Sequence, residues 1–396
     1  MNSSRSTKLA SISLREIEIP LIEPFNSAGG TVDRRRVLLV EMIDVDGLTA
    51  WSECVAEAFP AYSPDTVDTA WLALTEYIIP LVLKQVSGDA RSINTLFDNR
   101  IRGHAMPRAA VEMGFWALEA IRSGKSLAAT LVRASNSATP NQTPRSTVTT
   151  GIALGMMTSP DALADRAAVA VAEGYQRIKL KVVPGRDVSF ARAVRHRIGD
   201  EVQLTVDANC SYSLTNAANR QSLNELDQLG LRMIEQPLAH DDLVNHAALQ
   251  RRLVTPICLD ESIQGVASAE AMVLLGSARV VNIKPGRVGG LQQALAIHDV
   301  CVRAEVAAWC GGMLETGIGR AYNVALASLP GFTEPGDLSP SARYYERDII
   351  VEPWTMDAHG SVRVPLEQAG LSIDVDVDYI DELTARRTTF RAPGAG

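Results

Sequence analysis

The stretch RIKLKVVPG, Arg177–Gly185, contains two lysines within an apolar strand pattern. Lys179 and Lys181 alternate with isoleucine, leucine and valine, and alternate residues of a strand point to opposite faces. Both ammonium groups therefore leave a buried element on the same side. This arrangement indicates that one face of the strand borders a polar site and not only a hydrophobic core.

Strands of this kind recur at near-constant intervals along the second part of the chain. They alternate with helical patterns and read TVTTGIALGM, RIKLKVV, QLTVDANC, LRMIEQPL, TPICLDES, RVVNIKPG and VAAWCGGM. Polar residues at the strand ends lie 24 to 28 residues apart, at Lys181, Asp207, Glu235, Asp260 and Lys284. A strand–helix unit repeated at this length predicts an α/β fold with a parallel (β/α)8-type barrel, a modified TIM barrel. An open doubly wound sheet is the alternative, and the lack of a glycine-rich phosphate turn after these strands disfavours it.

The first part of the chain has a different organisation. Residues 8–55 read as strands, and residues 64–132 show the apolar period of helices. Strands followed by helices predict a separate α+β module. The polar stretch 134–147, ASNSATPNQTPRST, reads as a linker between this module and the barrel.

The composition of the chain excludes several classes of protein. The 396 residues are 46% hydrophobic, carry a net charge of −8 and contain no basic run that could follow a phosphate backbone, so nucleic acid is not an expected partner. The N-terminal stretch lacks the apolar core of a signal peptide, and no apolar run reaches a membrane-spanning length. Five cysteines form no CxxC pair, as is typical of reduced thiols. We therefore expect a cytoplasmic protein without a membrane partner.

Three acidic residues follow apolar strands, within TVDAN, MIEQP and CLDES. The C-terminal ends of barrel strands converge on one mouth, so Asp207, Glu235 and Asp260 are expected to lie around one point. Three carboxylates packed together repel each other, and a divalent metal relieves this repulsion. Oxygen ligands of this kind favour Mg²⁺, and Mn²⁺ also fits.

The lysines lie on the strands that flank these carboxylates. A metal between them would hold a small-molecule carboxylate with its α-carbon facing ammonium groups on both sides. Removing the weakly acidic α-proton requires stabilisation of the resulting dianion, which a divalent ion and nearby cations provide. We predict Lys181 and Lys284 as the two acid/base residues, and Lys179 as the neighbour that lowers a lysine pKa and stabilises charge.

The motifs KLK, DAN, EQP, DES and NIKPGRVGG, in this order and spacing, resemble the muconate-lactonising branch of the enolase superfamily. Residues 311–332, GGMLETGIGRAYNVALASLPGF, are similar to the subgroup of N-acylamino acid racemases and o-succinylbenzoate synthases. The resemblance implies Mg²⁺ held by the three carboxylates, and an α+β capping domain over residues 1–133. It further implies a barrel domain over 134–345 and a segment, 346–396, that returns to the cap.

The resemblance also implies contacts and an assembly. Cap loops at 25–30 and 53–62 would contact the distal part of the substrate, and a homo-oligomer is expected. Arg287 matches an arginine associated with racemising members, while Asn209 reads equally as a turn former or as a group behind the metal ligands. The predicted substrate-binding residues are Asn209, Arg287, Gly312, Met313, Phe25 and Tyr62.

Three related reactions remain open from the sequence. The leading hypothesis is racemisation of an N-succinylamino acid or another N-acylamino acid, in which one lysine removes the α-proton and the opposite lysine returns it. The alternative is syn dehydration to o-succinylbenzoate in menaquinone synthesis, alone or beside racemisation. A muconate-type cycloisomerase is the third reading. A binding scaffold without catalysis is disfavoured, because the lysines and carboxylates are all present.

Overall fold

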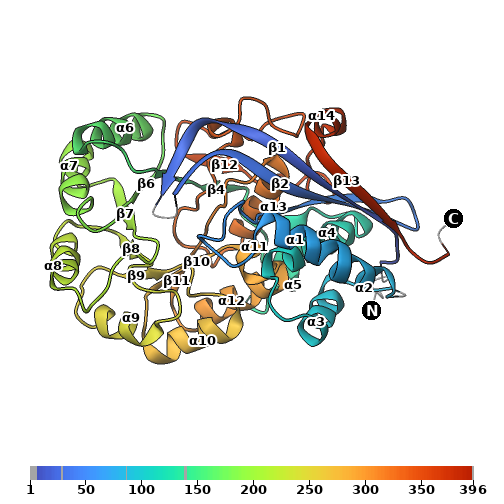
Figure 1. The fold of residues 1–396 in the computed structure, drawn as a ribbon, viewed down its shortest axis with the longest axis horizontal. Helices are drawn as coiled ribbons and strands as arrows, with labels where there is room; N and C mark the ends of the chain where they lie inside the picture. The colour runs from blue at the N-terminus through green and yellow to red at the C-terminus, as the bar shows by residue number, and fades with distance from the viewer. Residues whose placement is uncertain (1–6, 28–29, 86, 138–140, 395–396) are drawn as a thin grey trace.

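The computed structural model describes residues 7–27, 30–85, 87–137 and 141–394. An antiparallel sheet with its helices packs against a curled parallel sheet that is surrounded by helices (Figure 1). The long hairpin of β1 and β2, drawn in blue, extends from the antiparallel sheet toward the parallel sheet and ends near β6. No helix within the described residues has both the length and the apolar character needed to cross a membrane.

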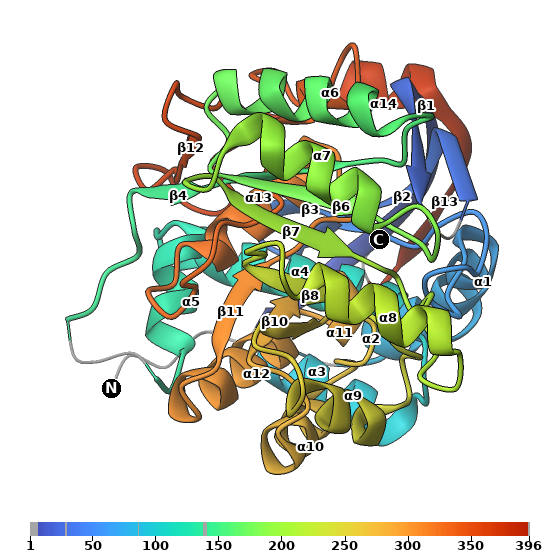
Figure 2. The same ribbon diagram turned by 90° about the vertical axis from the view of Figure 1, so that its left-hand side faces the viewer.

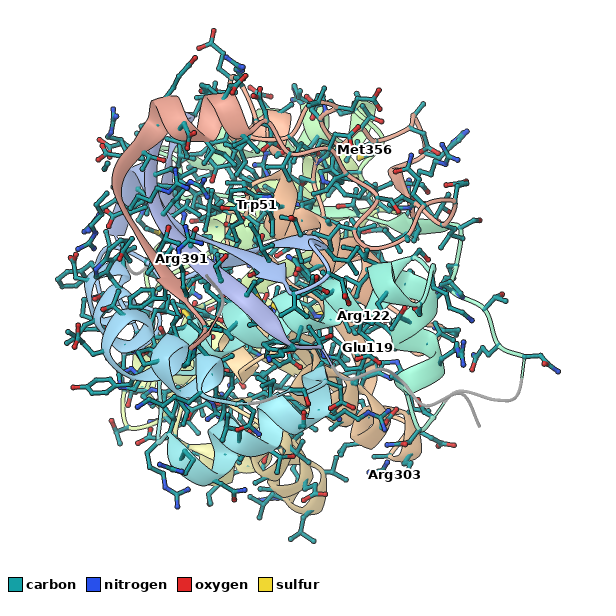
Figure 3. All side chains as sticks on the ribbon, turned by 90° about the vertical axis from the view of Figure 1, so that its right-hand side faces the viewer. Trp51, Glu119, Arg122, Arg303, Met356 and Arg391 are labelled. Atoms are coloured by element: carbon teal, nitrogen blue, oxygen red, sulfur yellow. The ribbon has the colours of Figure 1, made fainter. Side chains whose placement is uncertain are left out.

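The antiparallel sheet has the strand order β13-β1-β2-β3. Its strands are β1 (Leu9–Ser27), β2 (Gly30–Asp44), β3 (Thr49–Cys54) and β13 (Thr384–Arg391). Leu14 pairs with Val40 of β2 and with Thr388 of β13, so the last strand of the chain completes a sheet begun by the first. Figure 3 shows β13 curving along this sheet, with Arg391 at its end.

Helices from the first part of the chain cover this sheet. They are α1 (Val67–Ala73), the π-helical turn Leu74–Ile78, α2 (Ile79–Leu83), α3 (Ala90–Arg100), α4 (Ala105–Arg122) and α5 (Leu127–Ala134). Helix α4 carries the apolar stripe predicted from the sequence, and its residues Val111, Phe115 and Leu118 are buried. We refer to β1–β3, α1–α5 and β13 together as the cap.

Seven parallel strands form the second sheet, in the order β11-β10-β9-β8-β7-β6-β5. They are β5 (Gly151–Leu154), β6 (Arg177–Lys181), β7 (Gln203–Asp207), β8 (Met233–Glu235), β9 (Ile257–Leu259), β10 (Val280–Ile283) and β11 (Ala307–Cys310). The helices between and after them are α6 (Pro160–Ala172), α7 (Val188–Ile198), α8 (Ala217–Leu226), α9 (Leu243–Gln250), α10 (Val266–Leu275), α11 (Pro285–Val288), α12 (Leu291–Arg303) and α13 (Gly317–Ala327). Figure 2 shows the helices arranged around the strands, as the repeated strand–helix pattern predicted.

An extended segment, 333–338, occupies the eighth place of the barrel. The amide of Thr333 donates to Ala308 O of β11 at 2.9 Å, and the amide of Gly151 in β5 donates to Gly336 O at 2.7 Å. The segment therefore joins the two edges of the seven-stranded sheet and closes the barrel without forming a regular strand. The predicted modified (β/α)8-type barrel with an α+β module is confirmed.

The remaining elements lie near the C-terminus. Short strands β4 (Thr147–Thr149) and β12 (Ser361–Arg363) pair antiparallel, and a 3₁₀ turn (Ser341–Arg343) and α14 (Val377–Leu383) precede β13. One continuous cluster of buried apolar side chains runs through cap and barrel. A second small cluster, formed by Met233, Cys258, Val280 and Trp309, fills the barrel interior.

Two buried glutamates of the cap bind the N-termini of barrel helices. Glu112 of α4 accepts hydrogen bonds from the amides of Leu291 and Gln292, both at 2.8 Å, at the start of α12. Glu53 of β3 accepts from Thr316 Oγ1 at 2.6 Å and from the Gly319 amide at 3.1 Å, at the start of α13. At the N-terminus of each of these two helices, the residue that precedes the first turn makes no side-chain hydrogen bond to the free amides. The two glutamates of the cap domain therefore supply the acceptors that these amides require.

Candidate active site

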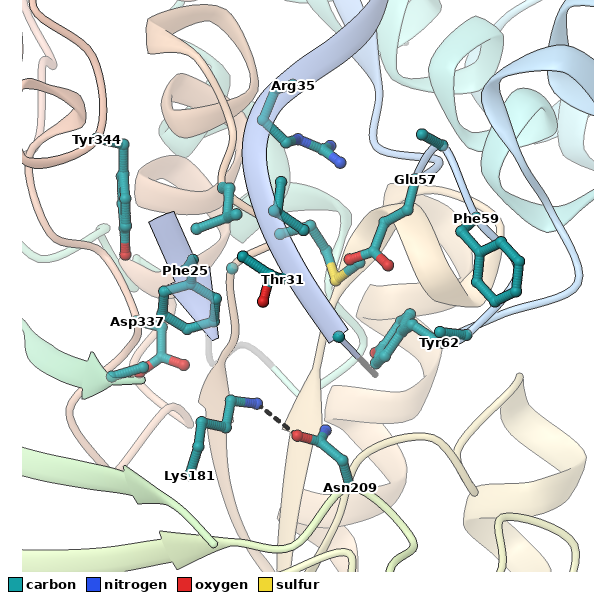
Figure 4. Close-up of a pocket in the computed structure, with 18 of the residues that line it drawn as sticks. Phe25, Thr31, Arg35, Glu57, Phe59, Tyr62, Lys181, Asn209, Asp337 and Tyr344 are labelled. Atoms are coloured by element: carbon teal, nitrogen blue, oxygen red, sulfur yellow. Dashed lines mark hydrogen bonds between the residues drawn. The ribbon is translucent and has the colours of Figure 1, made fainter. Parts of the chain in front are cut away.

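A cavity of about 550 Å³ lies between the cap and the C-terminal ends of the barrel strands (Figure 4). Lys179 and Lys181 of β6 and Lys284 after β10 line its barrel side. Five of the six predicted substrate-binding residues line it as well: Phe25, Tyr62, Asn209, Gly312 and Met313. Gly29 of the predicted loop 25–30 lies outside the described residues.

A row of polar groups follows the strand order from Lys181 through the carboxylates Asp207, Glu235 and Asp260 to Lys284. Lys181 lies at one end of this row. Its Nζ is 2.7 Å from Asp207 Oδ2 and donates to Asn209 Oδ1 at 2.8 Å, a hydrogen bond drawn in Figure 4. Asn209 in turn donates to Glu261 Oε1 at 2.9 Å. The Asn209 backbone has a φ of +40°, a conformation that asparagine tolerates better than most residues. Asn209 thus both forms a turn and orients Lys181.

Lys284 lies at the other end of this row. Its Nζ is 2.8 Å from Asp260 Oδ2 and 4.4 Å from the centre of the Tyr62 ring. Burial alone would lower the pKa of Lys284, but the Asp260 carboxylate and Tyr62 outweigh burial and raise this pKa well above its ordinary value.

Strands β7, β8 and β9 separate the two lysine-bearing strands β6 and β10. Lys181 and Lys284 consequently approach the cavity from opposite sides of the carboxylate row. Asp207 ends β7, Glu235 ends β8, and Asp260 follows β9 directly. The structure thus brings together the three predicted carboxylates and the three predicted lysines.

The surroundings of the three carboxylates show how they could hold a metal. Among the described residues, no three His, Cys, Asp or Glu side chains are gathered closely enough to hold one ion as they stand, and lysine ammonium groups lie between the carboxylates. Glu235 Oε1 accepts from Asn282 Nδ2 at 2.8 Å, whereas the buried Oε2 lacks a hydrogen bond within the described structure. Lys179 Nζ lies 3.1 Å from Oε2 without hydrogen-bond alignment.

The electrostatics of Glu235 favour a bound cation. Burial raises the pKa of Glu235 to about 7, and the neighbouring Asp207 adds to the rise. A cation near Glu235 would favour its ionised form. An all-oxygen donor set, in which one buried oxygen has no hydrogen bond among the described residues, fits a hard divalent cation such as Mg²⁺.

Arg287 occupies a different place from the predicted substrate contacts. It is buried and donates through Nη1 to Asp260 Oδ1, through Nε to Ile263 O at 2.8 Å and through Nη2 to Asn282 O at 2.7 Å. It lies behind Asp260 and is not among the described residues that line the cavity. Tyr62, predicted as a substrate contact, also donates to Asp260 Oδ1, at 2.8 Å. Both residues fix the orientation of Asp260.

Asp337 is an acidic residue of the cavity wall that the strand pattern of the sequence does not indicate. Asp337 lies in the closing segment 333–338 and contacts Lys179 Nζ at 2.5 Å. The sequence EPGDLSP, which contains Asp337, does not read as a strand. A signal was present, however, because Asp337 lies 27 residues beyond Cys310 at the end of β11, within the interval that relates the other strand ends.

Comparisons with known proteins agree with this geometry. Residues 10–131 match the family model of the mandelate racemase / muconate lactonizing enzyme N-terminal domain, and residues 162–379 match the enolase C-terminal domain-like model. An N-succinylamino acid racemase from Amycolatopsis sp is 42% identical over 380 residues, 96% of this chain and 98% of its own length. An o-succinylbenzoate synthase from Geobacillus stearothermophilus is 41% identical over 378 residues, 95% and 96% of the two chains.

Solved structures show the same relationship. An enolase superfamily member from Listeria innocua superimposes with a TM-score of 0.89 at 33% identity, over 98% of this chain and 100% of that one. A dipeptide epimerase from Cytophaga hutchinsonii, solved with Mg and a dipeptide, has the same fold at 21% identity, with a TM-score of 0.83 over 96% and 99% of the two chains.

The chain is therefore an enzyme that belongs to the enolase superfamily. Its relatives of about 40% identity place it in the subgroup of N-succinylamino acid racemases and o-succinylbenzoate synthases, which confirms the resemblance recognised in the motifs.

Proposed function

We propose that this enzyme racemises N-succinylamino acids, or related N-acylamino acids, by a 1,1-proton transfer between two lysines. The observation that carries the proposal is the placement of Lys181 and Lys284 on opposite sides of the carboxylate row, both lining one cavity. Inversion of a carbon centre requires a base on one face and an acid on the other. The 42% identical relative named N-succinylamino acid racemase supports the choice of substrate.

Each side chain has a distinct part in this reaction. Asp207, Glu235 and Asp260 would hold Mg²⁺ or Mn²⁺, which when bound supplies positive charge that stabilises the negative charge developing on the substrate carboxylate. Lys181 accepts the α-proton at Nζ in one direction of the reaction, and Lys284 donates a proton from its Nζ to the opposite face. The two lysines exchange these roles for the other enantiomer.

Other groups at the cavity prepare the site for this chemistry. Lys179 is buried, and although burial alone would lower its pKa, Asp337 and Glu235 raise that pKa above its ordinary value. It therefore presents a permanent positive charge beneath the substrate. The cap covers the cavity through Phe25, Val32 and Tyr62, which exclude water from the reacting carbon.

A second candidate is the syn dehydration that forms o-succinylbenzoate in menaquinone synthesis. The 41% identical relative of that name supports it, and so do the contacts of Lys284. Its ion pair with Asp260 and its position over the Tyr62 ring both stabilise an ammonium ion. In this reaction Lys181 alone removes the proton and returns it to the leaving hydroxyl, while Lys284 remains a cation.

Isotope exchange separates the two reactions. Each enantiomer of several N-succinylamino acids is incubated in D₂O with Mg²⁺, and α-deuterium and optical rotation are followed by NMR and polarimetry. Racemisation requires both lysines, so the Lys181→Ala and Lys284→Ala variants should each lose it by about 10²-fold or more. Each variant should retain exchange with the one enantiomer whose proton faces its remaining lysine.

The synthase is assayed in parallel by the ultraviolet loss of its cyclohexadiene substrate. Absence of exchange with every N-acylamino acid, together with rapid dehydration, would replace the racemase proposal by the synthase. We further propose a cytoplasmic homo-oligomer, which light scattering coupled to size exclusion tests by the mass of the particle.

A further inference from the structure

Asp337 is held rigidly at the wall of the cavity by its backbone. Its amide donates to Cys310 O of β11 at 3.0 Å, and its carbonyl accepts from Arg320 Nη1 at 2.7 Å. The side chain of Asp337 is 13% exposed and faces the cavity (Figure 4). The eighth place of the barrel therefore presents a fixed carboxylate beside the catalytic lysines.

This carboxylate bridges two cations of β6. Oδ1 is 2.5 Å from Arg177 Nη2, and Oδ2 is 2.5 Å from Lys179 Nζ. Both cations also lie over the ring of Trp309, at 4.1 Å and 4.7 Å from its centre. Arg177 and Lys179 are two residues apart on one strand and thus share a face, where without an anion between them they would repel each other.

The other partners of Lys179 do not fix it to the same extent. Its Nζ is 3.1 Å from Glu235 Oε2 and 3.6 Å from Asp207 Oδ2, both longer than the contact with Asp337. A lysine has a flexible four-carbon stem, so its charge stays in one place only where short contacts hold it. Segment 333–338 lies between the edge strands β11 and β5, whereas Asp207 and Glu235 lie on β7 and β8. Asp337 therefore approaches Lys179 of β6 from the side opposite these two carboxylates.

We propose that Asp337 is a positioning residue that fixes the ammonium group of Lys179 at the cavity floor. The proposal rests on the proposed function in one respect, namely that Lys179 stabilises charge on the substrate. A cation that is already in place when charge develops lowers the barrier more than one that must first move. Loss of Asp337 should therefore lower kcat much more than it raises KM.

The first experiment is a double-mutant cycle of Asp337→Asn and Lys179→Ala, assayed by α-proton exchange. We expect Asp337→Asn to lower kcat by about 100-fold, the cost of a misplaced catalytic group, with KM changed by less than about threefold. In the Lys179→Ala background the same substitution should cost less than about threefold, because Asp337 then has nothing to position. Equal losses in both backgrounds would overturn the proposal.

Three controls separate the proposed role from a general loss of structure. Glu334→Gln removes another carboxylate of the closing segment, which pairs with Arg232 through Nε at 3.0 Å and does not line the described cavity. It should leave kcat and KM unchanged. Thermal unfolding of all variants is measured in parallel, and Asp337→Glu should restore part of the lost kcat because it returns the charge.

The second experiment does not depend on activity. In a crystal structure of the Asp337→Asn variant, Nζ of Lys179 should be displaced or spread over several positions. An ammonium group that stays in its present place would overturn the proposal, whatever the reaction of the enzyme. If the wild-type enzyme exchanges no α-proton, the proposed function fails, and this structure still decides whether Asp337 positions Lys179.

Discussion

Replacing Glu112 with alanine should destabilise the protein strongly, although the residue lies far from the reacting groups in the chain. Glu112 is fully buried in α4 and accepts three hydrogen bonds. Two come from the amides of Leu291 and Gln292 at 2.8 Å, and the third comes from Trp116 Nε1 at 2.7 Å. Alanine removes the acceptor from all three donors at once.

The expected loss follows from these donors. A buried donor left without a partner costs about 1–3 kcal/mol, so three of them give a loss of about 3–9 kcal/mol in the free energy of unfolding. Gly290→Ala should produce a loss of similar origin, because its Cβ would lie 2.3 Å from Glu112 Oε2 and its φ is +124°. Either substitution would therefore disrupt the same contact between the cap and the N-terminus of α12.

Denaturant unfolding, followed by circular dichroism and tryptophan fluorescence, measures this loss. Glu270→Ala is the matched control, since Glu270 is an exposed glutamate on α10 and its removal should change stability by less than about 0.5 kcal/mol. A loss below about 1 kcal/mol for Glu112→Ala would refute the reasoning. It would mean that α12 does not need an acceptor from the cap.

Three further predictions concern the site and its surroundings. Chelation with EDTA should abolish α-proton exchange, and added Mg²⁺ or Mn²⁺ should restore it; exchange that persists after exhaustive chelation would contradict the assignment of the carboxylates. Gly311→Ala should lower kcat for α-proton exchange about 100-fold, because its Cβ would lie 2.2 Å from Asn282 Oδ1 and 2.7 Å from Lys284 Cε and would displace the lysine; an unchanged kcat would contradict the role of Lys284. Burial raises the pKa of Glu53 to about 7. This native pKa exceeds the unfolded value of about 4.3, so the folded protein binds the Glu53 proton more tightly than the unfolded chain does. The stability that this proton contributes is complete below pH 4 and is lost as the pH rises to about 7. Wild type should therefore lose about 3 kcal/mol relative to Glu53→Gln across this window, and parallel unfolding curves at all pH values would disprove the shift.

Much of the architecture was predictable, because strand ends repeat along the chain at the interval of one strand–helix unit. The positions of Lys181, Asp207 and Glu235 follow from that interval alone. The eighth place was not recognised, because segment 333–338 contains Pro335 and Gly336 and closes the barrel through a few backbone hydrogen bonds instead of a regular strand.

Periodicity and spacing along the chain were enough to predict the barrel, the α+β module, and the lysines and carboxylates at one mouth. The family followed from the resemblance of the strand-end motifs. Which of these groups pair with one another depends on the folded arrangement. Lys179 contacts Asp337, 158 residues away in the chain, and Tyr62 contacts Asp260, 198 residues away. Such contacts depend on the positions that the loops and the second sheet take in the folded protein. Burial then sets the charge of these groups, because the low dielectric of the interior strengthens each pair that forms and raises the cost of each charge left alone.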